Sequence, residues 1–218
     1  KLNILNKVYT EIPVLDLGPY MAGENGALEE LGVQVRNIQE TIGFWAVINH
    51  GVAWKKLEET YKQLKQFFAL SDNEKRRYLI NELSIGYVPP KSTKYITSII
   101  NENTKKDLNE TLITALERPP DHPLIKAGTR FVGPNQWPEG LPGFRDAIVS
   151  YQQEILKLGR KLLPIFSVAL ELPPSYFDQY FTDPVMWSRN AHYPAEVPEK
   201  NQYGIAPHSD HSFLTMLP

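Results

Sequence analysis

The segment His208-Ser209-Asp210-His211 carries the residues of this sequence that are best suited to chemistry. If the segment is a strand, its side chains alternate between two faces, so His208 and Asp210 point the same way. One imidazole and one carboxylate on one face supply two ligands of a 2-His-1-carboxylate iron site, which leaves positions open for a cosubstrate and dioxygen. A His-x-Asp pattern alone also occurs in ordinary polar turns. His211 is an alternative ligand if the segment is a loop.

The composition limits the classes of function to consider. Of the 218 residues, 42% are hydrophobic and 22% are charged, which is typical of a globular domain. The absence of cysteine excludes disulfides, thiolate metal sites and cysteine nucleophiles. The formal charge of -2, with both signs interspersed, argues against nucleic-acid partners. No apolar run reaches the roughly 20 residues that span a bilayer, and the N-terminus lacks the pattern of a secretory signal. We therefore expect a cytoplasmic protein that binds neither nucleic acid nor membrane.

The first part of the chain predicts alternating strands and helices. Residues 12–17 (IPVLDL) and 44–48 (FWAVI) are short apolar runs typical of strands, and the second is expected to be buried. Apolar residues three and four apart predict amphipathic helices over 28–42 and 54–68. These strands and helices are expected to form the hydrophobic core that supports a functional site.

Further helices and loops are expected before the His-x-Asp segment. Ser71 and Glu74 form the Ser-x-x-Glu pattern of a capping box, so a short helix begins there. Residues 86–142 are rich in Pro, Asn, Thr and charge, which indicates ordered loops with a few short strands. A long helix is predicted from about 142 to 172, with Pro164 inside it.

After the long helix the pattern changes to that of strands. Residues 185–193 and 205–217 are each expected to form one, separated by the charged loop AEVPEKNQ. The second of these predicted strands would carry the His-x-Asp pair.

Six segments resemble, in the same order, the landmarks of the isopenicillin N synthase-like family of iron(II)/2-oxoglutarate-dependent dioxygenases. Six ordered matches are much more specific than any single one, and they extend over essentially the whole chain. The segments are IPVLDL (12–17), GFWAVINHGV (43–52), FFALSDNEKRRY (67–78), LPGFRDAIVSYQQEILKLGRKLL (141–163), MWSRNAHYP (186–194) and APHSDHSFLTMLP (206–218).

The resemblance implies a mixed α/β fold with a double-stranded β-helix (jelly-roll) core. Residues 1–218 would form a single oxygenase domain that is incomplete at its C-terminal end. Within it, 1–95 would be an N-terminal α/β region, 141–172 a long supporting helix and 183–218 the start of the jelly-roll core.

The resemblance also implies roles for individual residues. His208 and Asp210 would bind Fe(II), and Tyr193 of the Tyr-Pro segment would contact 2-oxoglutarate or line the substrate pocket. Many relatives carry Asn two residues before this tyrosine, whereas this chain has Ala191. In the family, the third iron ligand is a distal His, and an Arg-x-Ser motif that follows it binds 2-oxoglutarate. No residue of this sequence matches either of them, and both are expected beyond Pro218.

Two other side chains are candidates for binding substrate. Arg189 lies four residues before Tyr193, so on a strand the two share a face, although a structural ion pair is the alternative for Arg189. Tyr87 is expected near the mouth of the pocket, with a structural role as its alternative. His50, in the Asn-His-Gly turn, is expected to be structural, and Phe44 and Trp45 to belong to the core.

The expected activity is an oxidoreductase reaction with Fe(II), 2-oxoglutarate and O2. It would hydroxylate, desaturate or cyclise a small organic molecule. Three alternatives remain: an oxidase of the isopenicillin N synthase type that needs no 2-oxoglutarate, a non-catalytic binding member of the fold, and a zinc-dependent hydrolase using His208, Asp210 and His211. The sequence predicts neither the substrate nor the oligomeric state.

Overall fold

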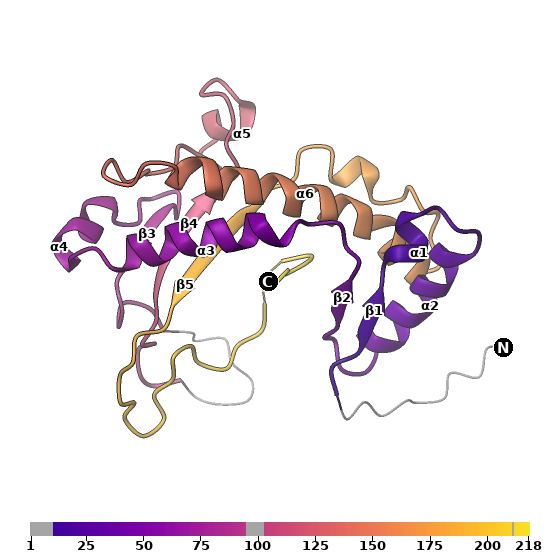
Figure 1. Ribbon diagram of the computed structural model, residues 1–218, viewed down its shortest axis with the longest axis horizontal. Helices are drawn as coiled ribbons and strands as arrows, with labels where there is room; N and C mark the ends of the chain where they lie inside the picture. Colours follow the sequence, from indigo (N-terminus) through magenta and orange to yellow (C-terminus); the bar gives the residue numbers. More distant parts are fainter. Residues whose placement is uncertain (1–10, 95–102, 211) are drawn as a thin grey trace. The chain divides into compact units, whose positions relative to one another are not determined.

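The computed structural model describes residues 11–94, 103–210 and 212–218 (Figure 1). They form a mixed α/β structure, as expected from the sequence, and it divides into two compact units. The first unit comprises the chain up to Ala53 together with Glu154–Pro184, and the second comprises Trp54–Gln153 together with Val185–Pro218.

The first unit contains a parallel sheet of two strands. β1 (Val14–Asp16) pairs with β2 (Ala46–Ile48), which confirms both predicted strands. The expectation that the second strand is buried is wrong, since Ala46 and Ile48 are exposed. α1 (Gly18–Met21) follows β1 directly. α2 (Ala27–Gln39) confirms the predicted amphipathic helix, because the residues it buries recur at helical spacing: Ala27, Leu31, Gly32, Val35 and Ile38.

Gly32 lets α2 approach the C-terminal half of α6 (Phe144–Ala169) closely. A Cβ atom at Gly32 would lie 2.6 Å from Cγ1 of Val168, so a larger side chain does not fit without a shift. α6 confirms the long helix predicted around Pro164, and the short 3-10 helix η2 (Asp178–Tyr180) follows it.

The prediction that Phe44 belongs to the core is wrong, since its side chain is 62% exposed. Trp45 is partly buried, with its ring 6.2 Å from that of Phe166. The reason is that the two-stranded sheet buries Leu15 on one face but leaves Val14 on the other face exposed. A strand pattern predicts which side chains share a face, but not whether another element covers that face.

The second unit begins with the predicted helix, α3 (Trp54–Phe68), and the capped helix α4 (Asp72–Lys75). The capping box is present: the Glu74 N–H donates to Oγ of Ser71, and the Ser71 N–H donates to the Glu74 carboxylate at 3.0 Å. The 3-10 helix η1 (Arg76–Tyr78) follows. α3 lies beside the first half of α6 (Figure 1), and Oγ1 of Thr60 donates to the carbonyl oxygen of Ala147.

A three-stranded antiparallel sheet forms the centre of the second unit. β3 (Gly86–Val88) and β5 (Trp187–His192) flank β4 (Glu110–Ala115). All six residues of β4 are buried, and the short helix α5 (Pro123–Lys126) follows it. The described residues of the stretch 86–142 therefore form ordered loops with short strands, as predicted. The associated core cluster consists of Leu64, Phe67, Tyr87, Leu112, Phe144 and Ile148.

The strand predicted over 205–217 is not formed. The described residues of that range are bends and irregular backbone, so the predicted strand alternation does not operate there. A strand needs a neighbouring strand to satisfy its backbone groups, and the backbone before His208 instead bonds to an irregular segment of the chain.

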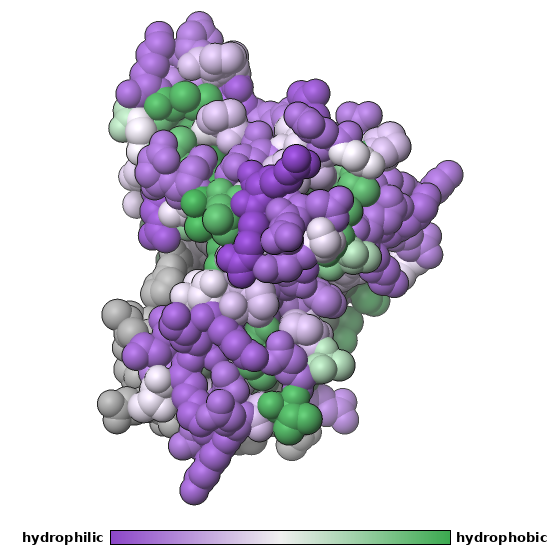
Figure 2. Space-filling model, turned by 90° about the vertical axis from the view of Figure 1, so that its left-hand side faces the viewer, coloured by the Kyte–Doolittle hydropathy of each residue, from purple (hydrophilic) through white to green (hydrophobic). Residues whose placement is uncertain are grey.

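The surface drawn in Figure 2 is mainly hydrophilic, with apolar side chains scattered among polar ones. Within the described ranges, no helix has both the length and the apolar character needed to cross a membrane.

Candidate metal and cosubstrate site

The His-x-Asp segment is held by hydrogen bonds from residues about one hundred positions earlier in the chain. The backbone N–H groups of Leu108 and Asn109 donate to the carbonyl oxygens of Tyr203 and Gly204, each at 3.0 Å. The Asn109 side chain donates to Gly204 as well, at 2.6 Å. These bonds fix the backbone of the loop before His208, although the loop is not a strand.

Two further side chains restrain the residues directly before the motif. Oδ1 of Asp107 accepts the Ala206 N–H at 2.9 Å, and Nδ2 of Asn103 donates to the carbonyl oxygen of Pro207 at 3.0 Å. Both Asp107 and Asn103 are buried. The last two residues before His208 are therefore anchored at a backbone N–H and at a carbonyl oxygen.

His208 and Asp210 lie close together, as predicted, but in a loop. Nε2 of His208 is 3.5 Å from Oδ1 of Asp210, and Nδ1 of His208 is 2.8 Å from the carbonyl oxygen of Ala206. Because a carbonyl oxygen only accepts, Nδ1 of a neutral ring carries the proton and Nε2 keeps a lone pair. The pair presents an imidazole nitrogen and a carboxylate oxygen, the donor atoms that a 2-His-1-carboxylate site requires.

A third ligand is not found. Among residues 11–94, 103–210 and 212–218, no group of three or more His, Asp or Glu side chains could hold a metal ion. Of the three protein ligands that such a site requires, His208 and Asp210 are thus the two that the described residues offer. His211, the alternative ligand, lies outside the described residues. His50 lies in its turn, where Nδ1 accepts the Val52 N–H at 3.2 Å.

The electrostatic environment next to the motif is unusual because of Asp107. Burial raises the pKa of Asp107 above its ordinary value of 3.8, while the Ala206 N–H and the nearby Arg189 and His208 act in the opposite direction. Its Oδ2 atom is buried and has no hydrogen-bond partner among the described residues. The sequence analysis did not single out Asp107. The signal available was the mainly polar segment DLNE (107–110), which ends on the first residue of β4.

Arg189 lies within β5, and Tyr193 is the residue directly after the last residue of this strand. Tyr193 is 51% exposed, and a Cβ atom at Gly204 would lie 2.8 Å from its ring, so the loop before His208 passes directly over the tyrosine. Nη2 of Arg189 donates to Oδ1 of Asn109 at 3.1 Å. Tyr193 thus contacts the loop before His208, and Arg189 contacts the segment that holds this loop.

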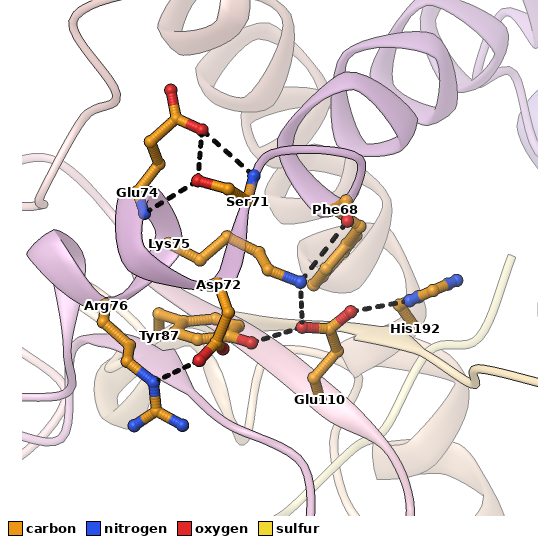
Figure 3. Close-up of polar contacts among 9 residues, drawn as sticks. All are labelled: Phe68, Ser71, Asp72, Glu74, Lys75, Arg76, Tyr87, Glu110 and His192. Carbon is orange, nitrogen blue, oxygen red and sulfur yellow. Dashed lines mark hydrogen bonds and ion pairs between the residues drawn. The ribbon is translucent and has the colours of Figure 1, made fainter. Parts of the chain in front are cut away.

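Tyr87 is not at a pocket mouth in the described residues. Its side chain is completely buried, and its hydroxyl donates to the carboxylate of Glu110 (Figure 3). Glu110 also accepts from Nζ of Lys75 at 2.7 Å and contacts Nδ1 of His192 at 2.8 Å. Burial and the hydrogen bond to Glu110 raise the pKa of Tyr87 well above 10.0. The geometry corresponds to the structural alternative, and a substrate contact by Tyr87 stays a prediction.

The Glu110 network joins four elements of the second unit. Figure 3 shows Lys75 reaching down from α4, Tyr87 approaching from β3 and His192 from β5, all toward one carboxylate on β4. The His192 ring stacks on that of Phe68, with centroids 5.2 Å apart. The network fixes the end of β5 from which Tyr193 continues.

Comparisons with known proteins add a family match. Residues 12–140 match the family model described as non-haem dioxygenase in morphine synthesis, N-terminal, which is more than half of the chain. The chain is 32% identical over 215 residues to kihadalactone A synthase of Citrus sinensis, which covers 95% of this chain and 62% of that protein. It is 30% identical over 216 residues to the 2-oxoglutarate-dependent dioxygenase citB of Monascus ruber, which covers 94% of this chain and 64% of that protein. The chain therefore spans less than two thirds of the length of both curated relatives.

A solved structure shares the fold. A putative 2OG-Fe(II) oxygenase family protein from Caulobacter crescentus matches with a TM-score of 0.71 and 20% identity. The match covers 88% of this chain and 58% of that one. At this identity the likeness concerns the fold, and it extends over most of the chain.

Proposed function

Because this chain belongs to the isopenicillin N synthase-like family of iron(II)/2-oxoglutarate-dependent dioxygenases, we propose that the complete protein is such an enzyme, oxidising a small organic molecule with O2. The observation that carries the proposal is the pairing of His208 and Asp210, whose Nε2 and Oδ1 atoms are 3.5 Å apart in an anchored loop. Hydroxylation, desaturation and ring closure are all compatible with it.

His208 and Asp210 would hold Fe(II), with a third ligand from a part of the protein that this sequence does not contain. Bound iron supplies the activation of O2 with 2-oxoglutarate as cosubstrate. The chain's own contribution is to present Nε2 of His208 and the Asp210 carboxylate in a fixed arrangement. Tyr193, half exposed beside the loop, would contact 2-oxoglutarate or line the pocket. The jelly-roll core would begin in the region 183–218.

Arg189 and Tyr87 remain candidates for binding substrate. Arg189 is bonded to Asn109 on the side of the sheet where the loop passes, which suits contact with an anionic group. Tyr87 would contribute only after a rearrangement that frees its hydroxyl from Glu110, so Arg189 is the stronger candidate.

The alternatives differ in what they require of the cosubstrate and of the metal. An oxidase of the isopenicillin N synthase type would need no 2-oxoglutarate, and the Monascus ruber relative, a 2-oxoglutarate-dependent dioxygenase, supports dependence on 2-oxoglutarate instead. A zinc hydrolase would depend on His211 as the third ligand. A non-catalytic binding member would bind no iron.

The test is a spectroscopic titration of the complete protein. The protein is loaded anaerobically with Fe(II), and 2-oxoglutarate is added while the visible spectrum is recorded. A weak metal-to-ligand charge-transfer band is expected in the wild type and in His50→Ala, which serves as the matched histidine control, and its loss is expected in His208→Ala and Asp210→Ala. Iron binding without the band would favour the oxidase. Failure of the wild type to bind iron would refute the catalytic proposal.

A further inference from the structure

Asp107 contacts the loop that directly precedes the candidate iron ligands, although the two lie far apart in the sequence. The residue is only 1% exposed. Its Oδ1 atom accepts the Ala206 N–H, whereas its Oδ2 atom has no hydrogen-bond partner among the described residues. Burying a carboxylate with so few hydrogen bonds is costly, and such a group in a native protein calls for an explanation.

Ala206 connects Asp107 to His208. The N–H of Ala206 is bound by Asp107, and the carbonyl oxygen of the same residue lies 2.8 Å from Nδ1 of His208. This contact places the proton of the neutral ring on Nδ1 and leaves the lone pair on Nε2. Nε2 is the atom that lies 3.5 Å from Oδ1 of Asp210. The orientation of the imidazole therefore depends on where Ala206 is held.

Asn103 restrains the same loop one residue later. Its Nδ2 atom donates to the carbonyl oxygen of Pro207 at 3.0 Å. Asp107 differs from it in binding the residue whose own carbonyl oxygen lies against Nδ1 of His208. Asp107 is thus the more direct support.

We infer that Asp107 is a positioning residue for the iron site, which fixes Ala206 so that His208 stays in its Nδ1–H tautomer with Nε2 directed toward Asp210. The inference rests on the proposed function. Groups that orient a metal-binding histidine through its second nitrogen set its tautomer and ring orientation, and their removal typically weakens metal binding about ten- to one-hundred-fold.

The experiment compares three variants of the complete protein. Asp107→Ala removes the acceptor of the Ala206 N–H, and Asp107→Asn keeps an acceptor oxygen while removing the charge. Lys105→Ala is the matched control, because it breaks a contact between the same two segments, the ion pair with Glu199, without involving Ala206. Asp107→Ser replaces Asp107→Ala if the latter does not fold. Folding is checked by circular dichroism and thermal unfolding.

Two quantities are measured on each variant. The first is the dissociation constant for Co(II), followed by its visible absorption. The second is the tautomer of His208 in the metal-free protein, from nitrogen-15 NMR of the histidine rings, with the His208 signal identified by its loss in His208→Gln. A purely structural role of Asp107 would change thermal stability but would not change the tautomer in a folded variant.

The expected result is a dissociation constant raised about ten- to one-hundred-fold in Asp107→Ala, with a mixture of tautomers at His208. Asp107→Asn should restore most of the affinity and the Nδ1–H tautomer, and Lys105→Ala should match the wild type. A folded Asp107→Ala with wild-type affinity and tautomer would overturn the inference. If the wild type itself does not bind Co(II), the proposed function fails, and the tautomer measurement still decides the role of Asp107.

Discussion

Glu110 and His192 occupy directly paired positions of β4 and β5, and Nδ1 of His192 lies 2.8 Å from Oε1 of Glu110. The same carboxylate accepts a hydrogen bond from Nζ of Lys75. This contact joins the strand that leads to Tyr193 with a buried polar network, so the stability of that network bears on the candidate cosubstrate site.

Replacing Glu110 with Gln should destabilise the protein strongly. Lys75 is 8% exposed and would keep a buried charge without its carboxylate partner. Removing one partner of a buried ion pair costs about 3 kcal/mol or more. Urea unfolding of wild type and variant measures this loss of unfolding free energy. Glu199→Gln, which removes an exposed carboxylate bonded to Lys105, should lower the free energy of unfolding far less, because water and salt screen exposed ion pairs. Equal losses in the two variants would contradict the buried network.

The network should also appear in the pH dependence of stability. Burial raises the pKa of Glu110, but the hydrogen bonds from Lys75, Tyr87 and His192 outweigh it and lower the pKa below the ordinary 4.5. A lowered native pKa contributes stability that is present above pH 4.5 and is lost as the pH falls through the native value. The difference in unfolding free energy between wild type and Glu110→Gln should therefore shrink below pH 4.5. If the difference in unfolding free energy stays constant down to the pH at which the protein unfolds in acid, Glu110 does not have a lowered pKa in the folded protein.

Replacing Tyr193 with Phe should weaken 2-oxoglutarate binding without unfolding the protein. The tyrosine is 51% exposed, so its hydroxyl contributes little to the core. Losing a hydrogen bond to a charged group costs about 1.5 to 3 kcal/mol, roughly ten- to one-hundred-fold in the dissociation constant. Isothermal titration calorimetry of the Fe(II)-loaded protein under anaerobic conditions measures the dissociation constant for 2-oxoglutarate. Tyr203→Phe is the matched control on the neighbouring loop, and an equal effect there would remove the specific role of Tyr193.

Replacing Gly32 with Ala should destabilise the first unit despite the better helix propensity of alanine. The new Cβ atom would lie 2.6 Å from Cγ1 of Val168, inside contact distance. Overpacking of this kind costs about 1 to 3 kcal/mol, against a propensity gain of up to about 1 kcal/mol. A lower thermal midpoint is expected. Gly140→Ala, where nothing lies within 4 Å of the added atom, should leave the midpoint nearly unchanged.

The sequence by itself determined the elements whose signals are local. The helices α2, α3 and α6 follow from apolar spacing, and the capping box at Ser71 follows from two residues three positions apart. β1 and β2 were predicted from short apolar runs, and β5 from the change of pattern after the long helix. The sequence also identifies the candidate ligands, the imidazole of His208 and the carboxylate of Asp210.

Only the tertiary structure decided which segments meet and which faces are covered. The stretch before β4 is polar, and the burial of Glu110 depends on Lys75 and His192, which are 35 and 82 positions away. The predicted strand around His208 is absent, because pairing is a property of two segments and not of one. The direction of the His208 ring depends on Ala206, which Asp107 binds from 99 positions earlier in the chain. Such long-range contacts leave no periodic pattern, so a single sequence does not reveal them.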